Sequence, residues 1–527
     1  MILGDQRSPL LQKLIFLWIL GGIIPVHSAT VIFNNGGGDQ KWGTLFNWST
    51  NNLPQAADTA SIPSGFLTIL DSPVTNVNNI FLASTAGSAT LQVISGGSIS
   101  VAVRISIGRS GGGTGTYTQT GGTVIANAFA VGDDIAGVDG GISNGTISGG
   151  TLSVTNNLQI AISDSGSASG SSFTISGGSI SVGGNVNIGD NGNTASLTVS
   201  GGTLSMNNNI QRGLTGTNVA TLTLSGGMID LQPAGDPTPA NINVDTFNFQ
   251  GGTLKNVNEI NSGGAFSKTT SGTATLAGTV NFTGPLTVSA GTLIHNATWG
   301  AGVGSALTIS NGAFLGGTGI WKGNLTNQGT IRPSLGGTTG KLTIQGTYSG
   351  TGAISLSFAS PNTYDQLETT GNINLSGTTL IPLLASGFTP ANGSLFTNAI
   401  KSTGGTLSNT QFLSTQRASN TLVLTPVYNS SSVDLLVSRN LGTAETQIPN
   451  ATSAQKSVYN ALSASASSTD TDLQSIFDQL DLLPSTSALA SAMQELSPEK
   501  TIQILQFDTL RSVELQGSNI HQHLQES

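Results

Sequence analysis

The chain has 527 residues, 71 of them glycine, with no cysteine, 8% charged residues and a formal net charge of −9. The lack of a basic stripe argues against nucleic-acid binding, and the lack of cysteine rules out a disulfide framework. Beyond the N-terminus no apolar run reaches about 18 residues, so the low charge does not indicate membrane-spanning helices. After position 444 there are ten acidic and three basic residues, a net charge of −7. The first 444 residues therefore carry a net charge of −2.

Residues 1–28 are predicted to be a secretory signal peptide. Arg7 and Lys13 flank an apolar stretch at 14–24, and small residues follow at 26–28 before Ala29. The alternative is an N-terminal membrane anchor. We therefore expect an exported chain that is found at the cell surface, in the outer membrane or outside the cell, and in the periplasm if no outer-membrane partner is supplied.

Residues 29–90 precede the repeats and contain Trp42 and Trp48. A stack of β-coils exposes apolar side chains and unpaired strand edges at its first coil. We predict that the two tryptophans cover that end, as an N-terminal cap followed by the first coils.

Residues 91–300 are organised by a recurring Ser-Gly-Gly motif, for example Ile-Ser-Gly-Gly-Ser-Ile-Ser-Val at 175–182. The first glycines of successive copies are 25, 28, 28, 24, 25 and 25 residues apart. A fixed period of this length is typical of a solenoid. The corner glycines are Gly96, Gly97, Gly121, Gly122, Gly149, Gly150, Gly177, Gly178, Gly201, Gly202, Gly226, Gly227, Gly251 and Gly252.

Within one repeat the apolar residues alternate with polar ones, a period of two that indicates β-strands rather than helices. Three short strands and three corners in about 25 residues predict one coil of a right-handed, single-stranded parallel β-helix, in an all-β fold. A β-sandwich is the rival fold, but it gives no reason for a fixed period. In one coil we expect Thr198 to face outward and six residues to face inward: Ile180, Val182, Val186, Ile188, Leu197 and Val199.

The three corners of a coil differ in composition. The Gly-Gly corner predicts a tight bend with positive φ, and the second carries asparagines, which can stack their amides. The third corner varies in length, so its loops are predicted to form one ridge, our candidate ligand surface. The acidic residues of these loops are Asp133, Asp134, Asp139, Asp164 and Asp190.

No catalytic, cofactor-binding or metal-binding residue is predicted. Asp133, Asp134 and Asp139 could form a carboxylate set or a Ca²⁺ site, but aspartate beside glycine is more simply a turn residue. The segment 163–170 fits a serine-nucleophile pattern without the required strand–turn–helix context. His295, the one histidine in the solenoid, is about five coils away. Outward positions are uniform instead: Thr118, Thr146, Thr174, Thr198 and Thr223 recur in successive coils.

Residues 301–440 carry a more specific pattern. Gly-Thr-Gly-Ile-Trp-Lys-Gly-Asn at 317–324 is followed by Lys-Leu-Thr-Ile-Gln-Gly-Thr-Tyr at 341–348, Tyr-Asp-Gln-Leu at 364–367 and Gly-Phe-Thr-Pro at 387–390. This order resembles the C-terminal part of autotransporter passengers. It departs at Arg332-Pro-Ser, where the family usually has Pro-Gly-Asn. The start, with Trp42 and Asn-Trp-Ser at 47–49, also resembles the head of bacterial surface β-helices.

From 441 to 527 the periodicity becomes helical. Leu473, Ile476, Phe477 and Leu480 share one helix face before Pro484, and Ser497-Pro498 predicts the start of another helix. The segment resembles the linker that precedes an autotransporter barrel. The resemblance implies a partner, an outer-membrane translocator barrel, which we expect to be on a separate chain or lost.

The sequence therefore predicts a secreted, cell-surface autotransporter passenger that is structural or adhesive, with a host-cell or glycan ligand for its loops. It is not expected to be an enzyme or to need a cofactor. The alternative is a β-helix polysaccharide lyase or hydrolase, a class in which acidic and basic groups gather on one face of a coil.

Overall fold

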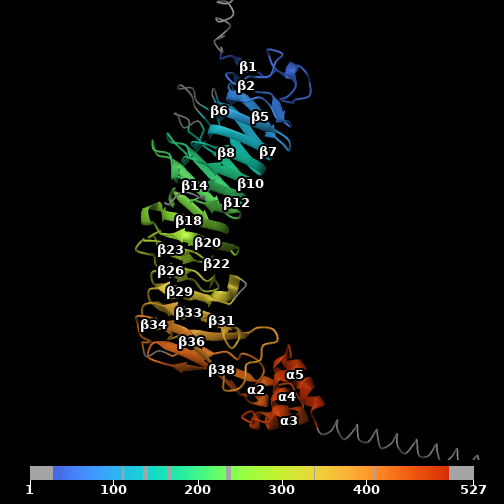
Figure 1. The fold of residues 1–527 in the computed structure, drawn as a ribbon, viewed down its shortest axis with the longest axis vertical. Helices are drawn as coiled ribbons and strands as arrows, with labels where there is room; N and C mark the ends of the chain where they lie inside the picture. Colours follow the sequence, from blue (N-terminus) through green and yellow to red (C-terminus); the bar gives the residue numbers. More distant parts are fainter. Residues whose placement is uncertain are drawn as a thin grey trace, which may run out of the picture. The chain divides into compact units, whose positions relative to one another are not determined.

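The computed structural model describes residues 28–109, 112–133, 140–162, 168–232, 239–336, 339–408 and 411–497. The chain divides into two compact units, one reaching Gly264 and one starting at Ala265. Both are built from parallel β-strands that stack from coil to coil, as in a β-solenoid, and the second adds short helices (Figure 1). The predicted signal peptide, apart from Ser28, lies outside the described residues.

In the part of the first unit that the structure describes there are strands β1 to β18 and two 3-10 turns. Their bounds are β1 Thr30–Ile32, η1 Leu45–Asn47, β2 Thr59–Ile62, β3 Leu67–Leu70, β4 Val77–Leu82, β5 Gly87–Val93, β6 Ser98–Ile107, β7 Gly113–Val131, β8 Asn144–Val154, β9 Leu158–Ile160, β10 Ser171–Val182, β11 Val186–Ile188, β12 Thr194–Met206, β13 Ile210–Arg212, β14 Val219–Leu224, β15 Met228–Asp230, β16 Ala240–Asn243, β17 Thr246–Phe249, β18 Gly252–Ile260 and η2 Asn261–Gly263.

The predicted coil is confirmed in register and in burial. Strand β10 pairs in parallel with β8 on one side and β12 on the other, and β11 pairs with β9 and β13. The six predicted inward residues are at most 2% exposed, while Thr198 is half-buried on the other face and pairs with Thr174 and Thr223. Two of the three predicted strands merge: β10 runs through the Gly-Gly bend as one strand with a local register shift.

The two glycines of a corner are required for different reasons. Gly178 has φ +73°, the left-handed conformation that was predicted. Gly177 does not, but a Cβ atom built on it would lie 2.2 Å from the carbonyl oxygen of Ser148 in the preceding coil. At this corner the first glycine therefore allows close stacking and the second allows the bend; at Gly96 and Gly97 the order is reversed, with the positive φ at Gly96 and the 2.3 Å approach, to the carbonyl oxygen of Leu70, at Gly97.

Asparagines connect the second corners across coils. The main-chain N–H of Asn185 donates to Oδ1 of Asn157 at 2.9 Å, that of Asn209 to Oδ1 of Asn185 at 3.1 Å, and that of Asn241 to Oδ1 of Asn209 at 2.9 Å. Each amide thus satisfies a main-chain donor that the corner removes from the strand ladder.

The tryptophans at the start of the chain are buried, as a cap requires. Trp42 and Trp48 are fully buried with ring centroids 4.8 Å apart, and Phe33 packs edge-on against Trp48 at 5.2 Å. The indole N–H of Trp48 donates to the carbonyl oxygen of Trp42 at 2.9 Å.

Within its described residues, the second unit contains strands β19 to β39, one 3-10 turn and four helices. Their bounds are β19 Phe266–Lys268, β20 Thr273–Val280, β21 Leu286–Val288, β22 Thr292–His295, β23 Thr298–Trp299, β24 Leu307–Ile309, β25 Phe314–Gly316, β26 Ile320–Lys322, β27 Leu325–Asn327, β28 Thr330–Arg332, η3 Pro333–Gly336, β29 Lys341–Gln345, β30 Tyr348–Gly350, β31 Ala353–Ser360, β32 Thr363–Tyr364, β33 Gln366–Thr369, β34 Ile373–Asn374, β35 Thr379–Leu384, β36 Leu395–Ser402, β37 Ser414–Thr415, β38 Leu422–Tyr428, β39 Ser432–Arg439, α2 Ala444–Gln447, α3 Ser453–Ala464, α4 Thr471–Asp481 and α5 Thr486–Glu495.

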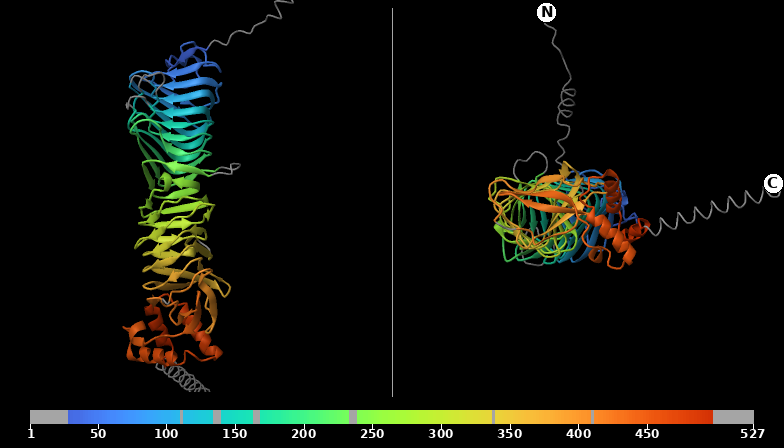
Figure 2. Two further views of the ribbon diagram at one scale, coloured as in Figure 1. Left: turned by 90° about the vertical axis from the view of Figure 1, so that its left-hand side faces the viewer. Right: turned by 90° about the horizontal axis from the view of Figure 1, so that it is seen from below.

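Toward its C-terminal end, the parallel solenoid of the second unit is followed by antiparallel strands. Strands β26, β29, β33 and β36 are parallel neighbours, but β36 then pairs antiparallel with β39, and β39 with β38. The β38–β39 hairpin was not predicted. Helix α4 was, and it starts at an Asp470 N-cap and ends before Pro484. Figure 2 shows the helices grouped beyond this hairpin. The helix expected after Pro498 lies outside the described residues.

Candidate functional site

The third-corner loops leave the coils at equivalent positions. The loops after β4, β6, β7, β9 and β11 each start at a residue with left-handed φ whose main-chain N–H donates to a carbonyl oxygen of the preceding coil, as Gly189 does to Ile160 at 2.8 Å. The residues of this column are Ala83, Gly108, Gly132, Ala161 and Gly189, with φ between +51° and +69°. The loops thus begin one above another, coil by coil.

Asp133, a predicted loop residue, is buried at the base of its loop. Its carboxylate is 0% exposed, lies 3.3 Å from Nε of Arg104 and accepts a hydrogen bond from the Ser106 hydroxyl at 2.5 Å. Arg104 also donates to Oε1 of Gln159 at 2.5 Å. Arg104 therefore links residues from three coils, and the enclosure of the Asp133 carboxylate suits a structural ion pair better than contact with a large substrate.

A second arginine lies near this pair. The guanidinium of Arg109 lies 3.5 Å from the ring centroid of Phe81, a cation–π arrangement. Burial lowers the pKa of Arg109 from its ordinary value, and the charge of Asp133 opposes that shift. The sequence analysis missed this gathering of two arginines and an aspartate, because Arg104 and Asp133 are separated by a whole coil and meet only through stacking.

Asp190 joins two neighbouring loops. Its Oδ1 accepts hydrogen bonds from the main-chain N–H of Thr215 at 2.8 Å and from the Thr215 hydroxyl at 2.5 Å. The carboxylate thus holds one loop against the next, in addition to its local bond from the main-chain N–H of Asn191 at 2.9 Å. Asp134, Asp139 and Asp164, like the serine segment 163–167, lie outside the described residues. Elsewhere in the chain, the described residues contain no group of three or more His, Cys, Asp or Glu side chains able to hold a metal ion.

His295 in the second unit is fully buried against Trp321, whose ring centroid is 5.2 Å away. Neither ring nitrogen has a hydrogen-bond partner among the described residues that meets normal geometry. Burial lowers the pKa of His295 to about 4, and the nearby main chain of Ile320 opposes this only in part. A neutral, enclosed imidazole such as this one cannot reach a substrate in solution.

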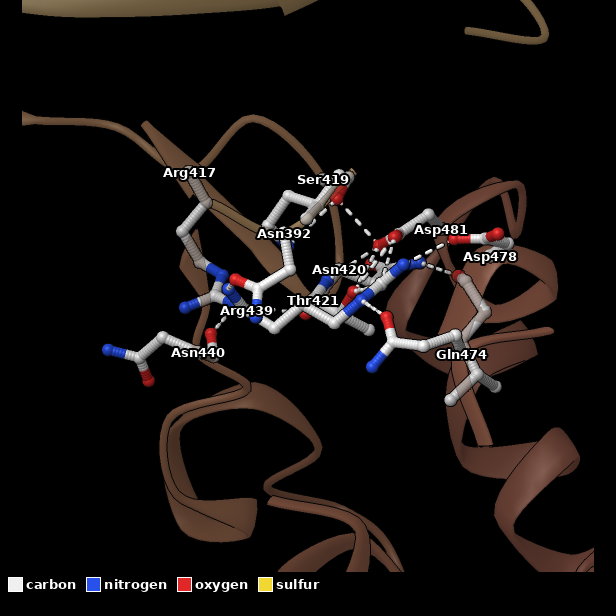
Figure 3. Close-up of polar contacts among 12 residues, drawn as sticks. Asn392, Arg417, Ser419, Asn420, Thr421, Arg439, Asn440, Gln474, Asp478 and Asp481 are labelled. Atoms are coloured by element: carbon white, nitrogen blue, oxygen red, sulfur yellow. Dashed lines mark hydrogen bonds and ion pairs between the residues drawn. The ribbon is translucent and has the colours of Figure 1, made fainter. Parts of the chain in front are cut away.

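An extensive polar cluster lies where the helices dock on the terminal hairpin (Figure 3). Arg439 of β39 donates to Asp481 of α4 at 2.9 Å and to the Thr421 hydroxyl at 2.7 Å, and it forms an ion pair with Asp478. The side chains of Arg439 and Asp481 are each 1% exposed. The amide of Asn420 donates to the carbonyl oxygen of Leu480 at the end of α4 at 2.7 Å. This cluster fixes the helices to the sheet.

The motif Tyr-Asp-Gln-Leu has a structural explanation in this unit. The fully buried carboxylate of Asp365 accepts main-chain N–H donors from Ser357 at 2.9 Å, Gly340 at 3.0 Å and Ser334 at 3.3 Å. The Asp365 carboxylate thereby joins the turn after β28 to β31. It is fully engaged and is not a free catalytic acid.

A scan against protein-family models, a search of curated proteins and a search of solved structures gave no match to this chain. Among the described residues, no helix is both long enough and apolar enough to cross a membrane.

Proposed function

We propose that this chain is a secreted or cell-surface β-solenoid of the autotransporter-passenger type, with a structural or adhesive role and no catalytic role. The observation that carries the proposal is the column of corner residues, from which loops of different length leave an otherwise uniform stack of coils. A repeat scaffold of this kind suits the presentation of loops to a ligand. The passenger-like motifs at 317–390 and the signal-like N-terminus support the same function.

Expression of the full chain in a Gram-negative host tests this proposal. We expect the protein to be processed after residue 28 and to be found in the periplasm. Fusion of a translocator barrel after Glu526 should make it accessible to protease on intact cells. Cytoplasmic retention of the unprocessed chain would contradict the proposed export.

One observation favours the alternative, a polysaccharide lyase or hydrolase: Arg104, Arg109 and Asp133 lie close together. The full chain should nevertheless leave polygalacturonate uncleaved, with or without Ca²⁺, because the Asp133 carboxylate is enclosed. Turnover that is abolished by Asp133→Asn in a folded protein would favour the enzyme.

A further inference from the structure

The second unit contains an open pocket of about 410 Å³ beside the turn that follows β28. This volume is within the range of small-molecule sites, about 300–1,000 Å³. It is lined by the half-buried Arg332, by hydroxyl side chains and by part of β35. The other lining residues are Ser334, Thr339, Ser357, Ala359, Leu383, Leu384 and Ala385.

Arg332 is the unusual member of this lining. Its guanidinium makes no hydrogen bond and no ion pair with any described residue, and its Nε atom is buried without an acceptor. A buried donor without a partner is unfavourable unless a ligand or water satisfies it. Asp365, whose carboxylate accepts the main-chain N–H groups of Ser334 and Ser357, forms no ion pair with Arg332, so the guanidinium donors stay available to a ligand.

The hydroxyls beside Arg332 are held in place. The Ser334 and Ser357 oxygens lie 2.8 Å apart, and the main-chain N–H of each donates to the Asp365 carboxylate. A guanidinium with neighbouring hydroxyls is a donor set for a carboxylate or another oxyanion, which arginine binds with two parallel N–H donors. Leu383 and Leu384 add an apolar wall.

A neighbouring pocket of about 400 Å³ shares Leu384 and Ala385 with the first. It contains a second arginine, Arg417, whose Nε atom is also buried without an acceptor among the described residues, although its Nη2 donates to the carbonyl oxygens of Asn420 and Asn440. Asp481, which also lines this pocket, is engaged by Arg439 and Thr421. Two arginines in adjoining pockets favour a ligand with repeated negative charges.

The segment that supplies most of the lining is basic. Residues 265–444 carry seven basic and three acidic side chains, a net charge of +4, whereas residues 445–497, which supply Asp481 to the neighbouring pocket, carry six acidic and one basic. We propose that the Arg332 pocket and its neighbour bind an acidic oligosaccharide, with a uronate carboxylate on Arg332 and the sugar ring against Leu383 and Leu384. This site does not depend on the proposed surface location.

Calorimetric titration of the full chain with trigalacturonate, at fixed ionic strength, tests the site. The neutral methyl ester of the same trisaccharide is the matched probe. We expect the acid to bind and the ester to bind at least tenfold more weakly. Arg332→Gln should weaken binding of the acid at least tenfold, since it removes a charge-assisted contact, and it should leave Tm unchanged because no described residue depends on that guanidinium.

Lys401→Gln is the control, because it removes the same charge from a residue that lines a different pocket with Lys341 and Glu368. It should change the affinity less than twofold. Thr339→Asp is a second variant, which places a carboxylate in the Arg332 pocket and should also weaken binding tenfold or more. Equal binding of acid and ester, unchanged binding by Arg332→Gln and Thr339→Asp, or an equal loss in Lys401→Gln would overturn the proposal.

Discussion

The coils around β10 and the end of the second unit are stabilised by different means. Around β10, one set of interactions recurs at every coil: apolar inward columns, a Gly-Gly bend and an asparagine that accepts from the next main chain. At the end of the second unit, single side chains such as Asp365 and Arg439 each make contacts that occur once. Repetition distributes stability over many equivalent positions, whereas the end depends on a few residues.

The largest effect is expected from a charge placed in a repeated column. Val186→Asp would bury an unpaired carboxylate between Leu158 and Ile210 and should cost about 4 kcal/mol or more of unfolding free energy. Asn187→Asp is the control on the opposite face, where Gln211 can still donate to it, and should cost under about 1 kcal/mol. Chemical denaturation of both variants measures the difference. Equal costs would mean that the faces are assigned incorrectly.

Removal of Arg439 tests the dependence of the terminal region on single residues. Arg439→Met leaves Asp481 buried without its cation and should cost about 3–5 kcal/mol. Limited proteolysis should then cut within 444–495 while the solenoid persists. Lys456→Met, on helix α3, is the control and should leave the helices protected. Helices that remain protected in Arg439→Met would show that their apolar core alone holds them.

The free energy of unfolding of the second unit should depend on pH because of His295. Because the pKa of His295 is about 4 when folded and about 6.5 when unfolded, the unfolded state binds the proton first. The contribution of His295 to the free energy of unfolding is therefore fully present above pH 6.5. It is lost as the pH is lowered toward 4, by about 3 kcal/mol at most. His295→Phe keeps the packing against Trp321 and should remove that slope, as measured by denaturation at pH 7, 5.5 and 4. An identical slope in the variant would exclude His295 as its origin.

The smallest effect is expected at a corner glycine with free space around it. Gly192 has φ +86° and no atom within 4 Å of a built Cβ, so Gly192→Ala should cost only the left-handed strain, about 1–2 kcal/mol. Gly177→Ala, with its 2.2 Å approach to Ser148, should cost more than that. Thermal unfolding ranks the two variants, and a reversed order would show that stacking distance does not limit this corner.

Much of the fold could be predicted because it is encoded by local periodicity. The alternation of Ile180, Val182 and Val186 with polar residues fixes both the strands and their inward faces. The Arg104–Asp133 and Arg439–Asp481 pairs could not be predicted, since the partners lie 29 and 42 residues apart and neither leaves a local pattern. The sequence shows only that Arg332 departs from the passenger-like motif, and it does not indicate that the guanidinium is unpaired.

The left-handed column at the third corner also has a practical consequence. The main-chain N–H of each of its residues donates a hydrogen bond to the preceding coil before the loop begins. After the loop, the next strand pairs in the same register whatever the loop length. Foreign peptides inserted after Gly189 would therefore leave the stacking of β11 and β12 unchanged. The solenoid could thus serve as a display scaffold that carries guest epitopes at separations of one coil, about 4.8 Å per step.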